Sequence, residues 1–599
     1  MRLVLVNLSN GKVSCTSISR EVINSYLGGR GLGVRMLYDL APANVDPLSD
    51  ENPLIFLTSE LMGTGIPGAV KTCIATKSPL SGTVLMSLAG GDFGLRLRAA
   101  GIDGLVVTGK AESPCFLAVE KGEVRICDAG GLWGLTTDEC SRELLPQGTQ
   151  HTKVACIGPA GERGVLFASV MSDGHAFGRG GTGAVMGSKN LKAIVVHGRA
   201  ADIPHIEPRD EFRSLLTDIA RRIKQSPRLA RFGKYGTSGN ISLVNERGLL
   251  PTRNYSFTQF AEANSVSGEN LQPLMLRRFG CPGCPVRCRR LVQMKTGPHS
   301  DLIVDGPEYE TIWAFGPHLE NGDLDSILAA AWFCNSYGVD TISMGNVLGF
   351  LADCLERGIL CPDDIGSADF GFGNVRDVPD LIRLTALKEG IGSLLALGVK
   401  RAAQRLGEEA EGLAAHVKGL EMSGYDPRGA KGMGLGYATS PRGACHERAF
   451  LAQETFGAPP PMDRLAYKGK GRVVKQRQDE VAILDSLGIC VFAAGPDAVT
   501  MEDLARFYSM VSGSSFTTSD FQVIGERICN LERLYNLREG LVAADDDLPD
   551  VIKGNVQSQG PSKGHTVEIE AMLTEYYAAR GWTQDGRLTR EQEINALMK

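Results

Sequence analysis

Short apolar runs dominate the first third of the chain, where they alternate with glycine-containing turns. Runs of this length, bounded by turn residues, are typical of β-strands. They predict strands over residues 3–6, 53–58, 104–108, 154–157 and 193–196. Helical periodicity is scarce in this part, so the first third of the chain is predicted to be rich in β-structure.

The pattern changes after residue 206, where apolar positions recur at the spacing of one helix face. This spacing predicts helices over residues 211–225, 325–337, 343–357, 379–388, 391–406, 501–512 and 517–539. Residues 211–225 form an amphipathic segment with basic residues on one face. Residues 545–559 are polar and predict a surface loop. We see no internal repeat and no low-complexity tract.

Two changes of pattern suggest domain boundaries. One lies near residues 205–210, beside Pro204 and Pro208, and a weaker one lies near residues 418–424, where a helical run meets a glycine-rich stretch. The sequence therefore predicts an α+β fold. A β-rich domain at 1–208 is followed by two mainly helical domains at 209–418 and 419–599.

Composition excludes several classes of protein. The 599 residues are 43% hydrophobic and 22% charged, which is typical of a globular chain. The net charge of −6 gives no electrostatic footprint for nucleic acid. Because no apolar run reaches 18 residues and the first apolar stretch is too short for a signal peptide, we expect neither a membrane span nor secretion. The 15 cysteines are then expected to be free thiols in the cytoplasm.

Three cysteines stand at ligand spacing in C-P-G-C-P-V-R-C, namely Cys281, Cys284 and Cys288. Three thiolates on a bent loop suit an iron–sulfur cluster, which commonly takes a fourth, remote cysteine. Zinc with His299 as fourth ligand is an alternative, as are three incidental core cysteines. The order of spacings is the reverse of that in radical enzymes, which disfavours that class.

Cys490, in D-S-L-G-I-C, is the candidate for the remote ligand. It follows a turn, five residues after Asp485. On sequence alone, a buried free cysteine is the ordinary interpretation of this position.

Glycine-rich segments recur at residues 27–33, 88–94, 177–189 and 432–437. Backbone N–H groups in such segments can bind phosphates. Each one alone is more simply a turn, none shows the full strand–turn–helix pattern of a dinucleotide fold, and no P-loop is present. Together, and with Arg30 and Arg179 inside two of them, they favour a large phosphorylated cofactor.

Two further segments concentrate ionisable residues. S-P-R-G-A-C-H-E-R holds Arg442, His446 and Arg448, and G-P-E-Y-E-T holds Glu308 and Glu310. A lone histidine or glutamate is usually a surface residue, so these matter only if the fold brings them together.

In combination, the glycine segments, C-x-x-C-x-x-x-C, D-x-x-G-[LI]-C and R-G-A-x-H resemble the tungsten-containing aldehyde ferredoxin oxidoreductases over nearly the whole chain. The resemblance implies a β-rich N-terminal cofactor-binding domain that forms a base for two pyranopterins, closed over by two helical domains. It also implies tungsten held by the pterin dithiolenes, and magnesium that bridges the pterin phosphates, largely through backbone carbonyls.

Carried over by position, the resemblance implies a [4Fe–4S] cluster and a set of cofactor contacts. The implied cluster ligands are Cys281, Cys284, Cys288 and Cys490. The implied pterin and phosphate contacts are Lys71, Leu88, Gly90, Arg179, Gly180, Asn335, Val339, Asp340, Arg442, Arg448, Asp485 and Ile489. Leu88 stands where the family often has Asn, which a main-chain contact to magnesium tolerates. Lys71 keeps a basic charge that can meet a phosphate.

For catalysis, the resemblance implies that aldehydes are oxidised to carboxylic acids, with tungsten or molybdenum as electron sink. Glu310 would deprotonate water or direct oxygen onto the carbonyl carbon, and His446 would stabilise the oxyanion. A raised pKa from burial would suit Glu310. Asp485 would lie between pterin and cluster.

Electrons would pass to ferredoxin or to an iron–sulfur partner subunit, in a homodimer or a hetero-oligomer. Arg287, Arg289 and Arg290 are candidate docking charges; the alternative is that they bind pterin phosphate or simply solvate a loop. Residues 326–330 lack the acid of an interface iron found in some family dimers, so that iron is expected to be absent.

Two alternatives stay open. One is a related tungsten or molybdenum reductase that acts on another carbonyl or an acyl-CoA substrate. The other is a non-catalytic iron–sulfur or zinc scaffold without pterin.

Overall fold

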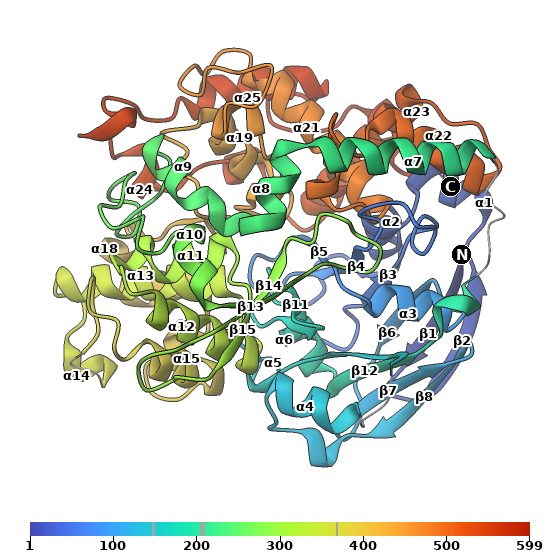
Figure 1. Cartoon of the computed structure of the whole chain (residues 1–599), viewed down its shortest axis with the longest axis horizontal. Helices are drawn as coiled ribbons and strands as arrows, with labels where there is room; N and C mark the ends of the chain where they lie inside the picture. The colour runs from blue at the N-terminus through green and yellow to red at the C-terminus, as the bar shows by residue number, and fades with distance from the viewer. Residues whose placement is uncertain (146–149, 204–209, 367–368, 599) are drawn as a thin grey trace.

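Two six-stranded β-sheets formed by the first 200 residues lie beside a mainly helical region formed by the rest (Figure 1). The structure, a computed structural model, describes residues 1–145, 150–203, 210–366 and 369–598. The predicted α+β class is confirmed. The predicted boundary near 205–210 falls largely on residues 204–209, which lie outside the described residues, so the three domain ranges stay a prediction.

All five predicted strands are present, each as part of a larger sheet. The first sheet, in spatial order, consists of β2 (Lys12–Ser17), β1 (Arg2–Asn7), β6 (Gly104–Thr108), β3 (Leu54–Leu57), β4 (Thr72–Lys77) and β5 (Val84–Ala89). The second consists of β11 (His175–Phe177), β10 (Val170–Ser172), β9 (Thr152–Cys156), β12 (Leu191–His197), β7 (Cys115–Glu120) and β8 (Glu123–Asp128).

The second sheet repeats the topology of the first. When its strands are taken from the other edge, the order is β8-β7-β12-β9-β10-β11, which is the first sheet with six added to every strand number. The parallel pair β1–β6 corresponds to β7–β12, and the antiparallel pairs β3–β6 and β9–β12 correspond likewise. The chain thus contains a structural repeat that the sequence does not reveal.

The helices of the first 200 residues lie between these strands in the chain. They are α1 (Arg20–Tyr26), α2 (Gly29–Leu40), α3 (Phe93–Ala99), α4 (Thr137–Leu144), α5 (Pro159–Glu162) and α6 (Thr182–Ser188).

The four glycine-rich segments are not all loops. Residues 88–94 and 177–189 each run from a strand through a turn into a helix, β5–α3 and β11–α6. Residues 27–33 enter α2, and residues 432–437 lie inside α19 (Lys431–Thr439). Close packing explains these helical glycines: a Cβ at Gly31 would come within 2.1 Å of the Tyr26 carbonyl oxygen.

The middle of the chain adds a small antiparallel sheet and a helical bundle. The sheet contains β13 (Met275–Phe279), β14 (Arg289–Gln293) and β15 (Ile303–Asp305). The helices are α7 (Asp210–Gln225), α8 (Pro227–Tyr235), α9 (Ile241–Glu246), α10 (Gly268–Leu271), α11 (Tyr309–Phe315), α12 (Leu324–Tyr337), α13 (Thr341–Glu356), α14 (Pro362–Ile365), α15 (Val378–Leu387), α16 (Gly392–Leu395), α17 (Gly398–Leu406) and α18 (Glu408–Glu411).

One predicted helix, 391–406, is interrupted. Gly398 adopts φ +76°, and a Cβ there would come within 2.5 Å of Leu80. Glu421 then accepts a hydrogen bond from the Val399 N–H, 3.0 Å away, at the start of α17. A left-handed glycine and a side-chain acceptor therefore divide the helix in two.

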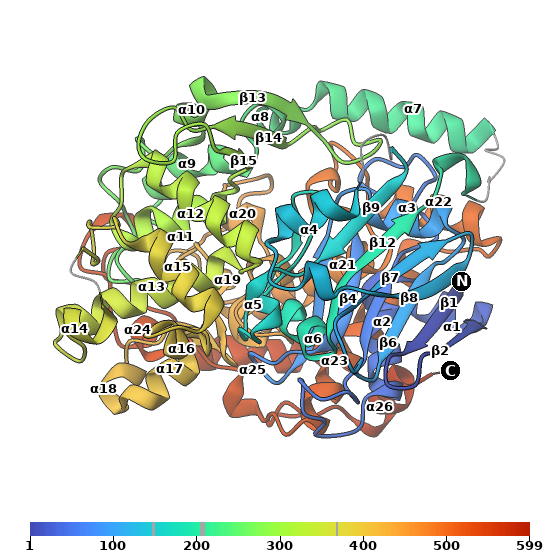
Figure 2. The same cartoon turned by 90° about the horizontal axis from the view of Figure 1, so that it is seen from below.

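The last part of the chain begins with the hairpin β16 (His416–Val417) and β17 (Leu420–Glu421) and continues in helices. These are α19, α20 (Ala452–Thr455), α21 (Lys470–Ser486), α22 (Met501–Ser512), α23 (Thr518–Arg538), α24 (Asp550–Lys553), α25 (Ile569–Arg580) and α26 (Arg590–Ala596). α21 packs against α2, α19, α23 and α25. α7 packs against α22 through Phe212 and Phe507, 4.8 Å between ring centroids, along the outside of the strands (Figure 2).

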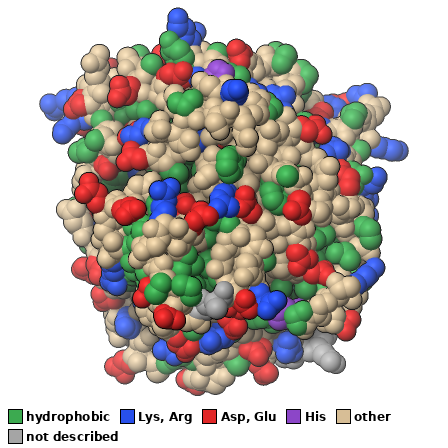
Figure 3. All heavy atoms as spheres, turned by 90° about the vertical axis from the view of Figure 1, so that its left-hand side faces the viewer, with side chains coloured by type: hydrophobic (Ala, Val, Ile, Leu, Met, Phe, Trp, Pro, Cys, Tyr) green, Lys and Arg blue, Asp and Glu red, His purple; other side chains and the backbone are tan. Residues whose placement is uncertain are grey.

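The prediction of a surface loop at 545–559 is partly wrong. This segment contains α24, and Asp546 is 2% exposed because it forms ion pairs with Lys418 and Arg533 at 2.8 Å each. The face that carries α13, α14 and α18 shows acidic and basic side chains interspersed (Figure 3). Within the described part of the chain, no helix is both long and apolar enough to cross a membrane.

Candidate active site

Glu310 and His446 meet in the interior of the protein. Glu310 lies in the first turn of α11, and its Oε1 is 3.4 Å from His446 Nδ1. Its Oε2 accepts a hydrogen bond from the Gly424 N–H at 2.8 Å. The same Nδ1 lies 2.9 Å from the Ser423 hydroxyl. Oε1 is buried and has no hydrogen-bond partner among the described residues.

A ring of buried tyrosines encloses Glu310. Tyr309 and Tyr425 stack at 4.7 Å, and the Tyr309 hydroxyl donates to the Gly424 carbonyl. Tyr255 and Tyr437 donate to the Ser423 carbonyl at 3.1 and 3.5 Å. Desolvation in this setting raises the pKa of Glu310, although His446 and the Gly424 N–H oppose the shift. A carboxyl group with a raised pKa can exchange protons near neutral pH.

Arg179 anchors the loop that follows β17. Its guanidinium donates to the carbonyls of Glu421 at 2.6 Å and Ala444 at 2.8 Å, and it lies 3.4 Å from the Ser423 hydroxyl. It also pairs with Asp340 at 3.3 Å. Asp340 in turn caps α13 by accepting from the Ile342 N–H at 3.1 Å. Arg179 thus ties the β11–α6 turn to the loop that carries Ser423.

A second basic group surrounds the end of β5. Arg442 and Arg448 both donate to the Met86 carbonyl, at 2.9 and 2.6 Å. Arg448 also pairs with Asp485, which Arg30 reaches at 3.2 Å. The Nε of Arg442 is buried without a partner among the residues that the structure describes. Around Met86 and Asp485, the guanidinium donors of the three arginines therefore outnumber the hydrogen-bond acceptors among the described residues.

Lys71 lies between the cysteines and this basic group. Desolvation would lower its pKa, but Cys490, Glu447, Cys281 and Asp485 raise it instead. Glu447 is 46% exposed, and desolvation by the surrounding protein would raise its pKa. Four basic neighbours outweigh that effect and lower the pKa to about 2; they are His446, Lys71, Arg442 and Arg448. Residues 442–448 consequently contribute to the Glu310 site, to the contacts of Arg179 and to the basic group at β5.

The four candidate cluster cysteines come together. Burial raises the pKa of Cys284 to about 11, with added effects from Cys490 and Cys281. Burial also raises the pKa of Cys288, and Cys490, Cys281 and Cys284 contribute. The Cys490 N–H donates to the Gly68 carbonyl at 2.8 Å, which fixes this candidate ligand beside the strand β4. All four thiols are partly exposed and free.

Among the described residues, no three His, Cys, Asp or Glu side chains are grouped tightly enough to hold one metal ion. A cubane cluster is bound by one thiolate at each of its irons, so its ligands need not converge on a single point. His299, the candidate fourth zinc ligand, packs its ring against Phe333 at 5.4 Å.

The contact that the structure shows at Cys281 is with a different histidine. Cys281 Sγ lies 3.6 Å from His175 Nε2, and the Gly91 N–H points at the same sulfur from 3.4 Å. Arg289 donates to that Nε2 at 2.7 Å and pairs with Asp305. Burial raises the pKa of Asp305 to about 6 in spite of Arg289.

Two of the three arginines considered for docking a partner are buried, so the prediction that they face a partner is wrong. Arg289 is 8% exposed and Arg290 is 2% exposed. Arg290 points inward because it donates to the Cys288 carbonyl and to Ser238. Only Arg287 of the three faces solvent.

Two matching turns link the helical region to the two sheets. After α12, Gly338 has φ +75° and Val339 forms a bridge to Ala168, just before β10. After α21, Gly488 has φ +70° and Ile489 forms a bridge to Ala69, just before β4. Since β4 and β10 are equivalent strands, N-S-Y-G-V-D at 335–340 and D-S-L-G-I-C at 485–490 occupy equivalent places.

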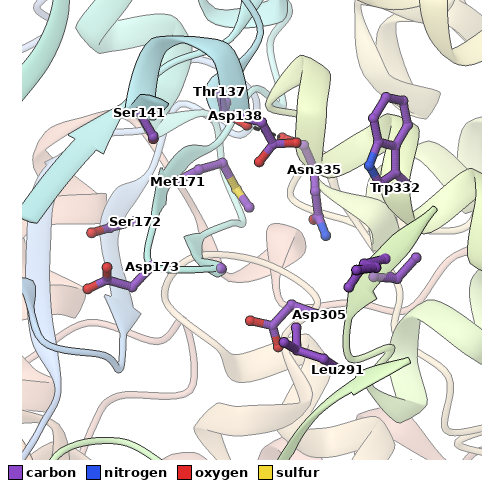
Figure 4. Close-up of a pocket in the computed structure, with 13 residues that line it drawn as sticks. Thr137, Asp138, Ser141, Met171, Ser172, Asp173, Leu291, Asp305, Trp332 and Asn335 are labelled. Carbon is purple, nitrogen blue, oxygen red and sulfur yellow. Dashed lines mark hydrogen bonds between the residues drawn. The ribbon is translucent and has the colours of Figure 1, made fainter. Parts of the chain in front are cut away.

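Asn335 faces away from the Glu310 site. Its side chain points into a cavity of about 270 Å³ between α4, the β10–β11 turn, β14–β15 and α12 (Figure 4). Asp138, Asp173 and Asp305 also line this cavity, whereas Glu310 and His446 do not. The Glu310–His446 pair therefore lies outside this cavity.

The other residues singled out from the sequence lie on β5 and at the two glycine turns, β5–α3 and β11–α6. Leu88 is half-buried in β5, opposite Cys73. A Cβ at Gly90 would come within 3.1 Å of Cys281 Sγ. Gly180 has φ +89°, and its carbonyl accepts from the Ser78 hydroxyl at 2.7 Å. The positions are thus established, and their roles stay predictions.

Several residues at these sites were not found from the sequence. They are His175, Asp305, Glu421, Ser423, Tyr255, Tyr309, Tyr425 and Tyr437. Glu421 to Asp426 combine acids, a serine and glycine in a fully buried stretch, and this density of polar residues was the available signal.

Comparison with known proteins agrees with this architecture. The description "Aldehyde ferredoxin oxidoreductase, N-terminal domain" matches residues 3–198, and "Aldehyde ferredoxin oxidoreductase, domains 2 & 3" matches residues 214–594. The tungsten-containing aldehyde ferredoxin oxidoreductase of Pyrococcus horikoshii is 39% identical, over 99% of this chain and 97% of its own. The WOR-like subunit of aliphatic sulfonate oxidoreductase from Pyrococcus furiosus is 32% identical over 100% and 96%.

Among solved structures, the active-site complex BamBC of benzoyl-coenzyme A reductase with 1,5-dienoyl-CoA has the same fold. The TM-score is 0.84 and the identity 24%, over 100% of this chain and 96% of the other. The fold and the comparisons together define an oxidoreductase. The chain belongs to the aldehyde ferredoxin oxidoreductase family.

Proposed function

We propose that this protein oxidises aldehydes to carboxylic acids, with tungsten or molybdenum held by two pyranopterins. The observation that carries the proposal is the contact between Glu310 and His446, inside a chain that belongs to this family. In the reaction the aldehyde carbon gains an oxygen from water and loses two electrons, and two protons are released. A buried acid–base pair at the substrate is what this proton transfer requires.

The residues present fit a large anionic cofactor. Lys71, Arg30, Arg442 and Arg448 gather around two carboxylates, Asp485 and Glu447, and the Arg442 Nε has no partner among the described residues. Such buried donors are suited to phosphate groups. We propose that these residues, with Arg179, Asp340 and the two glycine turns at Gly90 and Gly180, hold the two pterins. Asn335, Val339, Ile489 and the main chain at Leu88 complete the proposed set, and backbone carbonyls of these residues would hold magnesium.

When bound, the metal centre supplies a Lewis acid and a two-electron sink. The protein provides the rest. Glu310 Oε1, which has no partner among the described residues, takes a proton from water. His446 stays hydrogen-bonded to Ser423 through Nδ1, so its Nε2 can hydrogen-bond the carbonyl oxygen as negative charge develops. The buried tyrosines limit access of bulk water to Glu310.

We further propose that Cys281, Cys284, Cys288 and Cys490 bind one [4Fe–4S] cluster. Their mutual electrostatic effects and their partial exposure support this ligand set. The cluster would pass single electrons to ferredoxin or to an iron–sulfur partner subunit. We retain the expectation of a cytoplasmic enzyme, as a homodimer or in a hetero-oligomer.

The test combines metal analysis with a single assay. Protein purified without oxygen should contain one tungsten or molybdenum and about four irons per chain, and it should reduce viologen when an aldehyde is added. Zinc as the sole stoichiometric metal would overturn the cofactor assignment. Full metal content without aldehyde-dependent reduction would overturn the substrate assignment alone.

A second function is favoured by the comparisons, namely a reductase for another carbonyl or acyl-CoA substrate. The benzoyl-CoA reductase complex shares the fold, and a 32% identical relative is named for sulfonates. The retention of Glu310 and His446 in contact favours the aldehyde. Reduced viologen consumed by an acyl-CoA, with no aldehyde oxidation, would select the second function.

A further inference from the structure

The loop that carries Cys281, Cys284 and Cys288 lies at the surface. Pro282, Gly283, Pro285 and Arg287 are exposed, and the three cysteines are half-buried. Leu276 on the neighbouring strand β13 is 52% exposed. The centre of this surface is therefore formed by exposed proline and glycine residues beside the half-buried cysteines.

Basic side chains surround that centre. On β13, Arg277 and Arg278 are exposed, and Arg278 donates to the Gly233 carbonyl of α8 at 3.1 Å. Arg287 donates to the Arg278 carbonyl at 3.2 Å. These contacts place α8 next to the loop, as the view from below also shows (Figure 2). We call the exposed cations of this region the basic rim: Arg228, Arg231, Lys234, Arg277, Arg278 and Arg287.

Few carboxylates compensate the basic rim. Asp497 pairs with Arg228 at 2.7 Å, and Glu269 lies 3.7 Å from Arg231. Lys234, Arg277, Arg278 and Arg287 form no ion pair among the residues that the structure describes. This local excess of positive charge occurs in a chain whose net charge is −6, so it sets this surface apart.

We propose that the cysteine loop and the basic rim form the docking surface for a small acidic iron–sulfur protein. The proposal rests on the proposed function, because it assumes that electrons leave through the cluster. Electron transfer slows steeply with distance, so a carrier must approach the exposed loop closely. A centre of proline and glycine with a charged rim suits a small, short-lived contact, and opposite charge speeds the encounter.

The test uses the double variant Arg277→Glu/Lys234→Glu in the holoenzyme, with an acidic ferredoxin as probe. At low salt, kcat/KM for ferredoxin should fall at least tenfold, and viologen reduction should not change. The difference should shrink as salt is raised. The matched control is Lys121→Glu/Arg125→Glu on the exposed β7–β8 hairpin, which should behave like the wild type.

Three outcomes would overturn the proposal: an unchanged kcat/KM for ferredoxin, an equal loss with viologen, or the same loss in the control. If the enzyme oxidises no aldehyde, the proposed function fails and docking is measured directly. Calorimetry of oxidised ferredoxin binding should then show at least tenfold weaker binding to the double variant. Equal binding would overturn the docking surface on its own.

Discussion

Glu310 Oε1 lies 3.4 Å from His446 Nδ1, although the two residues belong to segments far apart in the chain. Glu310 is held by the Gly424 N–H and His446 by the Ser423 hydroxyl, so two adjacent residues of one loop position both groups. The loop itself is fixed by Arg179 from the N-terminal half. The proposed catalytic pair thus depends on four segments, which carry Glu310, His446, the 423–424 loop and Arg179.

The first prediction concerns this pair. Glu310→Gln keeps the shape of the side chain but removes the base, so turnover should fall by about 10²-fold or more while metal content is unchanged. His446→Asn should act similarly through lost stabilisation of the oxyanion. The control is Glu308→Gln, since Glu308 is exposed and bonds Thr237, and its effect should be mild. Near-normal turnover in both main variants would exclude the pair from catalysis.

The pH dependence should carry the signature of Glu310. Because desolvation raises its pKa and the base works as the carboxylate, kcat/KM should fall as pH falls through this raised pKa. The acid limb should therefore lie above the ordinary glutamate pKa of about 4.3. It should be absent from the residual activity of Glu310→Gln. An acid limb at an ordinary carboxyl pKa would contradict the assignment.

The same shift affects stability. A carboxyl whose pKa is raised by folding destabilises the folded state above its unfolded pKa, and the penalty disappears at pH values below it. Glu310→Gln should then raise the melting temperature at pH 7 and lose this advantage near pH 4. A variant that melts lower than wild type at pH 7 would show that the carboxylate is net stabilising.

The cysteine assignments predict a pattern of iron loss. Cys490→Ser should remove most of the iron, because it takes away the remote ligand, and Cys284→Ser should do the same. Cys73→Ser and Cys361→Ser serve as controls, one buried and one exposed. Iron and tungsten are measured together by mass spectrometry. Iron loss in the controls of the same size as in the two ligand variants would contradict the ligand set.

Arg289 and Arg290 should behave as structural residues. Arg289→Glu places a carboxylate beside Asp305 and removes the donor to His175, in a site that is 8% exposed. Uncompensated buried charges of this kind typically cost about 3–5 kcal/mol. We expect a lower melting temperature and loss of both viologen and ferredoxin reduction. Arg277→Glu, which is exposed, should leave the melting temperature near that of the wild type.

Local sequence patterns predicted the positions of helices and strands better than they predicted which strands pair in a sheet. The strand at 104–108 and the helix at 517–539 were evident from apolar spacing, because that spacing reflects which face is buried. The pairing of β6 between β1 and β3 was not, since it depends on contacts distant in sequence. The break at Gly398 was also missed, because it follows from the approach of Leu80, which apolar spacing does not encode.

The candidate site shows the same division. Cys281, Cys284 and Cys288 were evident from spacing, whereas Cys490 needed the family resemblance. Arg289 and Arg290 were wrongly taken as exposed, because a strand such as β14 gives no sequence sign of what covers its two faces. His175 was not found, since its role comes only from its position 3.6 Å from Cys281.

The repeated strand order bears on where the proposed cluster would bind. The two sheets have equivalent strands, β4 and β10. Just before each of these strands, the chain forms a bridge to a matching turn from the helical region. One turn ends in Cys490 and the other in Asp340, which is committed to capping α13 and pairing with Arg179. A thiolate can bind iron, and a carboxylate occupied in this way is not free to do so. The duplicated scaffold is therefore symmetric in backbone but not in chemistry, and the proposed cluster would be bound at only one of these two turns.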